Sequence, residues 1–488
     1  MSARDKILIT GVTGSLGSWM ARIVLESNRS VIALTRANSP AAARTRVFDA
    51  LRTVGADRYE DRVDVICGDI CEAPPSEAVT GRCRGLSGVV HCAGALEFRA
   101  EFAELDHRVN VRGTATMLTL AEALHVPFCC FSTAYIAGRR QGRVLESELD
   151  VGQDFNNPYE SSKCRAEQLV RAWAKRTHLP AFVFRPSIVV GDSREGRIVN
   201  FDGLYNFMRL LDGMAGLNHE REFRVVADPT ATKNIVTVDY VARMALHIMK
   251  TGSPGVYHLT NPCPLRLSTL RDILAELFDI RGARLVSAEE FQRPRPNRFE
   301  WMYQKLASTY APYLAAEPVF DRTNTDVVAR SADIELPEID MVLFRRLVDY
   351  ARKADWGKKG RVALPAEVDR VHFVERYFDS FLAEKMHRQL LPNLRRLSAN
   401  CRIHVEDLPG RSWSLRIDRG CLVKISENGL PCACTFRLHS DVFAAIVSGR
   451  LSPQAAFFSR KVDIEGDVET GLKLATVLAT FFRKWPYE

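Results

Sequence analysis

The first half of the chain alternates short apolar runs with amphipathic helical stretches. Runs that are apolar throughout are typical of strands buried on both faces of a parallel sheet. We expect such strands at Ile7–Thr10, Val31–Leu34, Val63–Cys67, Gly88–His91, Phe128–Ser132 and Ala181–Phe184. Helical patterns between them cover Ser18–Ser27, Val109–Leu124 and Ser161–Thr177. This alternation predicts an α/β fold with a doubly wound parallel sheet.

The pattern changes twice further along the chain. Helical periodicity at Leu204–Leu211, Tyr240–Lys250 and Leu267–Phe278 indicates a small substrate lobe, and prolines at 292–296 end it. From about Met386, alternating runs predict antiparallel strands at Cys401–Val405, Ser412–Arg416, Cys421–Ser426 and Ala433–Arg437. Helices are expected at Ser440–Ile446 and Val468–Phe482, the second capped by Asp467. We therefore expect a sheet domain with its lobe over 1–290, a mainly helical extension over 291–385 and an α+β domain over 386–488.

Composition narrows the class of protein. The chain has 488 residues, 46% hydrophobic and 26% charged, which is typical of a globular protein and excludes wholesale disorder. No apolar run approaches the about 20 residues that span a bilayer. The first strand pattern leaves no room for a secretory signal, so we expect a cytoplasmic protein with its 12 cysteines reduced and no metal site.

Charge adds little to this. The net charge of +8 is mild and suits an acidic carrier protein, a CoA phosphate or an anionic membrane surface. No nucleic-acid-binding module is expected.

A glycine-rich segment follows the first predicted strand and opens a helix. It reads Thr10-Gly11-Val12-Thr13-Gly14-Ser15-Leu16-Gly17. Glycines let the backbone approach a pyrophosphate, and a helix N-terminus offers free N–H groups, so the segment predicts a Rossmann-type dinucleotide site. The second strand leads to Arg36, where NAD-binding proteins usually carry an acid. A cation there suits the 2′-phosphate of NADPH, and Arg44 and Arg46 follow closely enough to assist.

Candidate catalytic residues follow later in the same half. Tyr159 and Lys163 lie four residues apart in a predicted helix and so share a face. A cationic amine beside a phenol lowers the pKa of the phenol, which can then pass a proton to a carbonyl oxygen that is receiving hydride. Thr133, at the carboxyl end of a predicted strand, is expected to hold the substrate oxygen. Ser132 is the alternative, because one residue of register decides which side chain faces the crevice.

These motifs together resemble the extended short-chain dehydrogenase/reductase superfamily over roughly residues 6–280. The matching segments are TGVTGSLG, Gly68-Asp69-Ile70, His91-Cys92-Ala93-Gly94, Asn110-Val111-Arg112-Gly113, FSTAYIAG, YESSK and Arg185-Pro186-Ser187. The resemblance implies that Asp69 and Ile70 lie at the adenine and that Asn110 supports a proton relay to Lys163. It also implies that Cys92, Ala93 and Gly94 line the cofactor. The segment Arg185, Pro186, Ser187 and Ile188 would contact its nicotinamide end.

Two further resemblances refine the expectation. The segments ALTRA at 33–37, RPSIVVGDSREGRI and 310–325 are similar to the thioester reductase and fatty acyl-CoA reductase branch. Residues 386–488 resemble a sterol carrier protein type 2 domain, which implies an apolar tunnel for fatty acyl chains, acyl-CoA or sterols. Leu474, Leu478 and Phe481 share one helical face that either forms core or lines such a tunnel.

Three functions are compatible with these features. The first is an NADPH-dependent reductase of a long-chain acyl thioester, bound to CoA or acyl carrier protein, that yields an aldehyde or alcohol. Its C-terminal domain would contact lipid or a membrane surface. The second is an NADP-dependent ketone or sterol dehydrogenase, or an enzyme acting on a nucleotide sugar. The third is a non-enzymatic lipid-binding NADPH sensor, against which the intact Thr133, Tyr159 and Lys163 argue, because a sensor needs no proton donor.

Overall fold

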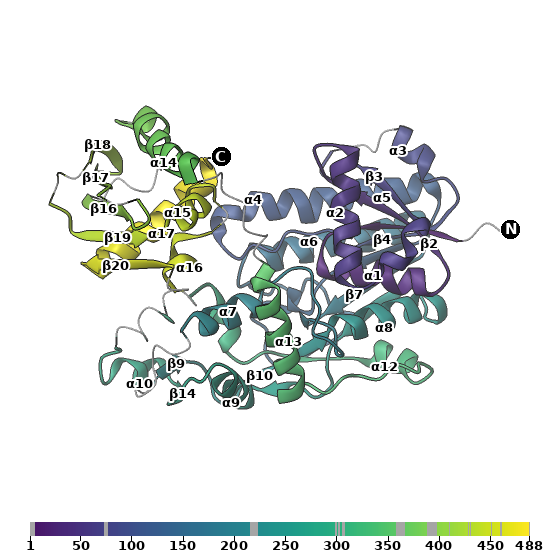
Figure 1. Cartoon of the computed structure of the whole chain (residues 1–488). Coiled ribbons are helices and arrows are strands. Elements are labelled where there is room, and N and C mark those ends of the chain that lie inside the picture. Colours follow the sequence, from purple (N-terminus) through teal and green to yellow (C-terminus); the bar gives the residue numbers. More distant parts are fainter. Residues whose placement is uncertain are drawn as a thin grey trace. The chain divides into compact units, whose positions relative to one another are not determined.

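The structure of the chain, a computed structural model, divides into two compact units (Figure 1). The first comprises residues 1–208 and 215–357, and the second 209–214 and 358–488. The described residues are 5–72, 77–214, 223–297, 300, 303–304, 308–357, 367–387, 398–408, 410–427, 429, 431–449, 451–458 and 461–487. Among the helices of these residues, none is long and apolar enough to cross a membrane.

The first unit is built on a seven-stranded parallel sheet. In spatial order its strands are β12 (Gly255–Leu259), β7 (Ala181–Pro186), β5 (Phe128–Phe131), β4 (Leu86–His91), β1 (Lys6–Thr10), β2 (Ser30–Thr35) and β3 (Val63–Cys67). Six of them confirm the strands expected from the apolar runs. The seventh, β12, was not expected, and it extends the sheet beyond β7.

Helices cover both faces of this sheet, which confirms the doubly wound architecture (Figure 1). Alternate strand residues point to opposite sides, so that Ile7 and Ile9 join one core and Leu8 the other. The first core is completed by α1 (Ser15–Glu26), α2 (Pro40–Thr53) and α8 (Val238–Thr251). The second core is completed by α5 (Gly113–Leu124) and α6 (Pro158–Thr177). Cys83, which directly follows α3 (Glu77–Arg82), also packs in this core.

The lobe that follows the sheet consists of short paired strands and helices. Its strand pairs are β8 (Ile188–Val190) with β11 (Ile235–Thr237), β9 (Phe223–Val226) with β14 (Ala283–Val286), and β10 (Thr232–Lys233) with β13 (Leu265–Arg266). Its helices are α7 (Leu204–Met214), α9 (Leu267–Leu277), α10 (Ala288–Gln292), α12 (Thr323–Ala329) and α13 (Met341–Lys353). One more pair, β15 (Val319–Phe320) with β6 (Arg143–Val144), returns a distant segment to the loop after β5. That return places residues 308–320 beside the carboxyl ends of the central strands.

The second unit is a five-stranded sheet with helices that share one core. Its order is β18 (Cys421–Glu427), β17 (Ser412–Asp418), β16 (Ala399–Val405), β19 (Cys434–Leu438) and β20 (Val462–Gly466). The expected strands and the helices α15 (Ser440–Val447) and α17 (Val468–Lys484) are present, with Asp467 accepting a capping bond from the Thr470 N–H at 3.1 Å. The pairing differs from the expectation of an antiparallel sheet, because β16 and β19 run parallel. The strand β20 and the short helix α16 (Pro453–Phe458) were not expected.

The helical segment before Met386 belongs to this second core. Helix α14 (Glu367–Arg376) and the π-helical turn η7 (Tyr377–Leu382) place Val374, Tyr377, Phe378 and Leu382 among the strand residues, each 5% exposed or less. The Phe378 ring stacks on that of Trp413 with 4.5 Å between centroids. The second compact unit therefore begins well before the change of pattern near Met386. The sequence did not indicate this boundary, because these buried side chains lie in a stretch that resembles a linker.

We predict that shortening the chain after residue 385 gives a poorly soluble protein, whereas shortening it after residue 357 does not. The longer form keeps four large side chains without the core that buries them, and burying each stabilises by about 1.5–3 kcal/mol. Soluble yield and binding of a hydrophobic dye measure the difference. Equal behaviour of the two forms would contradict the assignment of α14 and η7 to the second core.

Candidate active site

The glycine-rich loop lies where the strand order of the central sheet reverses, between β1 and β4. Ligands of open α/β sheets bind at this point, outside the carboxyl ends of the strands. Gly11 has a φ of +73°, and a Cβ there would lie 2.6 Å from the Ala93 nitrogen. A Cβ on Gly17 would lie 2.1 Å from the Gly11 oxygen. Only glycines fit, and the loop leads directly into the N-terminus of α1, so the residues present suit a dinucleotide pyrophosphate.

The end of β2 carries the expected cation. The Arg36 side chain is 64% exposed, and its Nη1 lies 3.8 Å from Asp69 Oδ2 at the end of the neighbouring strand. The Arg46 guanidinium donates to the Arg36 carbonyl oxygen. Arg44 instead lies over the ring of Phe48 in its own helix, 4.5 Å from the centroid. The structure thus brings Arg36, Arg46 and Asp69 to one edge and turns Arg44 toward its helix.

The other residues expected at the cofactor divide into two groups. The Ala93 N–H donates to Thr10 Oγ1 at 3.2 Å, and the partly exposed Cys92 and Gly94 follow β4 on the crevice side. Ile70 is 9% exposed and packs in the core, where a Cβ on Gly113 would meet its Cδ1 at 2.7 Å. Its side chain therefore supports the sheet.

Helix α6 begins with a cap that fixes the position of Tyr159. Asn157 Oδ1 accepts from the Glu160 N–H at 3.0 Å, and Pro158 occupies the first helical position. Glu160 reaches back, with Oε2 accepting from the Asn156 N–H at 2.8 Å. Both exchanges resemble a capping box, so the phenol of Tyr159 projects from a rigid first turn.

The surroundings of Tyr159 hold its phenol protonated. Burial raises the pKa of Tyr159 above its ordinary value, the hydrogen bond with Thr133 lowers it in part, and the carboxylates of Glu160 and Asp106 raise it again. The expectation that a neighbouring lysine lowers this pKa is not met here, because burial raises it and Lys163 is not among the groups that act on it. Of the two candidate hydroxyls, Thr133 is the one that hydrogen-bonds the phenol.

Lys163 and Asn110 lie directly beneath the phenol-bearing turn. The Lys163 ammonium donates to the Phe131 carbonyl oxygen at 2.6 Å, at the end of β5. Asn110 lies in a π-helical turn, η3 (His107–Arg112), and donates through Nδ2 to Ser162 Oγ at 2.9 Å. A Cβ on Gly94 would lie 3.1 Å from Asn110 Oδ1 and 4.0 Å from Lys163 Nζ, so the three residues are close neighbours. π-helical turns are rare and are often found at functional sites.

A buried chain of hydrogen bonds joins the glycine-rich loop to Asn110. Thr10 Oγ1 lies 2.8 Å from His91 Nδ1, and Thr114 Oγ1 lies 3.2 Å from His91 Nε2. Thr114 donates its own proton to the Asn110 carbonyl oxygen at 2.6 Å, so His91 must donate from Nε2 and accept at Nδ1. Burial, and then the charge of Lys163, lower the pKa of His91 to about 3. The imidazole is therefore a neutral brace in one tautomer.

Aromatic side chains from the connection after β4 and from a later segment lie beside Tyr159. The Phe98 ring is 6.1 Å from the Tyr159 ring and 5.3 Å from the Tyr313 ring, between centroids. The Tyr313 hydroxyl donates to Glu160 Oε1 at 2.6 Å, which ties η5 (Ser308–Leu314) to the first turn of α6. The Tyr135 hydroxyl donates to Glu317 Oε2 at 3.0 Å. Sequence reasoning noted this distant segment only as a resemblance, since no local pattern shows that it returns to the site.

Two family models match the chain, one in each unit. The model described as male sterility protein matches residues 9–245, and the model described as SCP-2 sterol transfer family matches residues 378–479. The first match contains the loop, Thr133, Tyr159 and Lys163. Residues 9–245 are thus similar to the male sterility protein family. They form a reductase domain of the NAD(P)-dependent short-chain dehydrogenase/reductase type, and an SCP-2 domain follows it, as the two resemblances implied.

Curated relatives match the reductase domain over only part of their own length. The nonribosomal peptide synthetase asaC of Aspergillus flavus is 29% identical over 306 residues, which are 57% of this chain and 29% of that protein. The aldehyde reductase lnaA of the same fungus is 24% identical over 385 residues, 71% of this chain and 36% of that protein. The chain spans about a third or less of the length of these two relatives.

Solved structures show the same fold. The terminal R domain of the myxalamid PKS-NRPS pathway is 22% identical with a TM-score of 0.61, over 73% of this chain and 92% of that one. The reductase domain of a nonribosomal peptide synthetase from Mycobacterium tuberculosis is 20% identical with a TM-score of 0.56, over 72% of this chain and 92% of that one. At this identity the likeness concerns the fold of the reductase domain.

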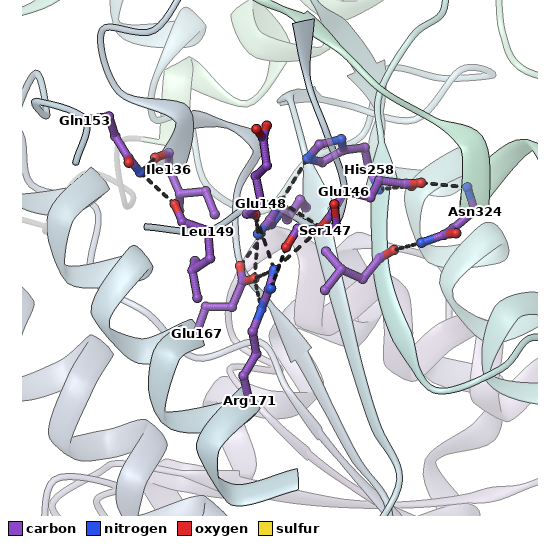
Figure 2. A network of polar contacts seen from close by, with 12 residues as sticks. Ile136, Glu146, Ser147, Glu148, Leu149, Gln153, Glu167, Arg171, His258 and Asn324 are labelled. Carbon is purple, nitrogen blue, oxygen red and sulfur yellow. Dashed lines mark hydrogen bonds and ion pairs between the residues drawn. The ribbon is translucent and has the colours of Figure 1, made fainter. Parts of the chain in front are cut away.

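Arg185 of the reductase domain has a different place from the one expected. Its side chain is fully buried and forms a bidentate pair with Glu167, with Nη2 2.6 Å from Oε1 and Nε 3.0 Å from Oε2. It also donates to the Glu148 carbonyl oxygen at 2.6 Å and lies 3.1 Å from His258 Nε2. Figure 2 shows the surrounding network, in which Arg171 of α6 donates to the backbone oxygens of Glu146, Ser147 and Glu148 and pairs with Glu167. The guanidinium is therefore committed inside the fold. Pro186 ends β7, Ser187 is 6% exposed, and Ile188 begins β8.

Asp106 is a residue of the site that the sequence did not reveal. It ends α4 (Ala103–Asp106), its side chain is 0% exposed, and neither carboxylate oxygen has a hydrogen-bond partner among the described residues. Burial raises the pKa of Asp106 to about 6, offset in part by the backbone N–H of Glu97, which makes no hydrogen bond of normal geometry. An acidic residue in a polar stretch such as ELDHR gives no signal of burial, so only the fold could show it.

We predict that Asp106→Asn stabilises the protein at pH 8 and not at pH 4. The folded-state pKa of about 6 lies above the unfolded value of 3.8, so the charged carboxylate destabilises the fold above pH 6 and the penalty disappears below pH 4. About two pKa units correspond to about 3 kcal/mol, and the buried amide retains part of the cost, so we expect a gain of about 1–3 kcal/mol. Urea unfolding at both pH values measures it, and equal gains would contradict it.

Proposed function

We propose that this chain reduces an acyl thioester with NADPH and that residues 1–357 carry the activity. The observation that supports it most is the phenol of Tyr159. It is kept protonated, it is hydrogen-bonded to Thr133, and it lies with Lys163 at the crevice edge that also carries the glycine-rich loop. A protonated phenol serves a reaction that ends with a proton on the substrate oxygen, which is the direction of reduction.

The arrangement supports the following division of roles. The loop and the N-terminus of α1 would hold the pyrophosphate, Arg36 would bind the 2′-phosphate, and Asp69 would bind the adenine. The reduced cofactor supplies a hydride to the thioester carbon when it is bound. Tyr159 passes its proton to the carbonyl oxygen, and Thr133 donates to the same oxygen. Lys163, held at the end of β5 by the Phe131 carbonyl oxygen, favours return of a proton to Tyr159. The C–S bond then breaks, the thiol leaves with the proton, and an aldehyde remains.

The proposed substrate class is supported by the relatives of the reductase domain and by the SCP-2 domain in the same chain. Relatives of the reductase domain include peptide synthetases, and one solved neighbour is a thiolation-reductase di-domain from an archaeal non-ribosomal peptide synthetase, with a TM-score of 0.58 and 20% identity over 72% of this chain and 76% of that one. The SCP-2 domain adds a lipid-binding fold in the same chain. We therefore favour a long acyl chain on CoA or on an acyl carrier protein, with the SCP-2 domain binding the chain or a membrane surface, in the cytoplasm.

We predict a preference for NADPH over NADH that Arg36→Asp narrows or reverses. Loss of the charge-assisted contact to the 2′-phosphate should weaken NADPH binding about tenfold, which corresponds to about 1.4 kcal/mol. We expect no larger effect, because the Arg36 guanidinium is exposed and its charge is partly screened by solvent. Titration of protein fluorescence with both cofactors measures this, and Arg29→Asp, a distant surface variant, is the control. Equal wild-type affinities for NADH and NADPH would contradict the assignment.

The function itself is tested by product analysis. The full chain is incubated with NADPH and a chain-length series of acyl-CoA and acyl carrier protein thioesters, and aldehydes and alcohols are identified by mass spectrometry. We expect Tyr159→Phe to lower turnover 10²–10⁴-fold, the usual contribution of a general acid, while NADPH binding stays within about threefold. Reduction of ketosteroids or other ketones with no thioester turnover would replace this proposal by a ketone reductase.

A further inference from the structure

A buried carboxylate with no partner lies beside the catalytic tyrosine. Asp106 is 0% exposed, and its charge is felt at the Tyr159 phenol. Most buried polar groups in proteins are hydrogen-bonded, so an unpaired one needs an explanation. An ionised carboxylate can only accept, so what it lacks is a donor.

The donors nearest in the fold are already engaged. Asn110, one turn further along the same helix, uses Nδ2 for the Ala95 carbonyl oxygen at 3.0 Å and for Ser162. The Lys163 ammonium donates to Phe131. His107 and Arg108, which follow Asp106 directly, have exposed side chains. Among the described residues, the backbone N–H of Glu97 acts on this carboxylate, but it makes no hydrogen bond of normal geometry with it.

The position of Asp106 points toward substrate. The connection after β4 rises from the carboxyl edge of the sheet, and the helix that follows runs back along it, so Asp106 is one turn further out over that edge than Asn110. Ligands of such sheets bind outside this edge. Glu97 and Phe98 border the same place, and Phe98 packs near Tyr159. The charge of Asp106 acts on the Tyr159 phenol, so a carbonyl held at that phenol lies in the same neighbourhood as Asp106.

We propose that Asp106 accepts the amide N–H nearest the sulfur in the pantetheine arm of the substrate and so selects pantetheine thioesters over simple ones. This rests on the proposed function. CoA and carrier proteins share this arm, in which two methylene groups separate the sulfur from the first amide nitrogen. Binding would supply the missing donor to Asp106, which favours its charged form. A hydrogen bond to an ionised group is among the stronger ones.

The test compares two thioesters of one fatty acid that differ in a single donor. The N-acetylcysteamine thioester has the amide N–H, and the S-(2-acetoxyethyl) thioester has an ester oxygen in its place. We expect wild-type kcat/KM to favour the first at least tenfold, Asp106→Leu to bring the ratio close to one, and Asp106→Asn, which can still accept, to give an intermediate ratio. Glu104→Leu, an exposed residue of the same helix, should keep the wild-type ratio.

The outcomes separate the two proposals. A wild-type ratio within twofold of one, or the same ratio in Asp106→Leu as in wild type, overturns the role of Asp106 and leaves thioester reduction intact. If wild type reduces no thioester, the proposed function fails, and calorimetric binding of pantetheine to the protein with NADPH still decides on Asp106. There we expect at least tenfold weaker binding in Asp106→Leu, and equal binding overturns the inference. Measuring kcat/KM for acyl-CoA and for acyl carrier protein thioesters with wild type and Asp106→Leu shows which carrier presents the pantetheine arm.

Discussion

The buried pair of Glu167 and Arg185 is the constraint on which the arrangement of the reductase domain depends. Tyr159, Lys163, Glu167 and Arg171 follow one another at four-residue intervals, so their side chains form one stripe along α6. The upper half of the stripe faces the crevice, and the lower half is bound to β7 and to the backbone after β6. Removal of one partner of such a buried pair typically costs 3–5 kcal/mol, because the other charge remains desolvated. The cost would fall on the helix that positions the phenol.

Polar groups at the site are of two kinds. His91, Asn110 and Glu160 have their partners within the protein and hold backbone segments in place. Asp106 and the hydroxyl of Ser132 are buried without partners among the described residues. The first kind contributes rigidity. The second kind lowers stability, and natural active sites commonly combine the two, because groups arranged for a ligand are poorly satisfied without it.

Sequence periodicity was sufficient for the strands whose residues are apolar throughout. It failed for β12 and β20, in which polar residues such as His258 and Glu465 interrupt the run and are accommodated by tertiary contacts. The parallel pairing of β16 with β19 was also missed, because strand direction depends on the path of the chain between them. At the site, the structure places the motifs with local spacing, namely the loop, Thr133 and the Tyr159–Lys163 pair, near the expected edge of the sheet, and their roles stay predictions. Arg185, Tyr313 and Asp106 were not placed correctly or not found, since their partners lie far away in sequence.

The π-helical turn η3 makes the geometry of the site depend on the number of residues in that turn. A π turn contains one residue more than an α turn, and here the surplus lies between Asp106 and Gly113. Losing one residue from this turn would restore regular α-helical hydrogen bonds and make the helix itself more stable. It would also rotate everything before it by about 100° relative to α5, taking the carboxylate away from the crevice. A single codon deletion would thus replace the side chain beside Tyr159 and leave the residues of the sheet and of the glycine-rich loop unchanged.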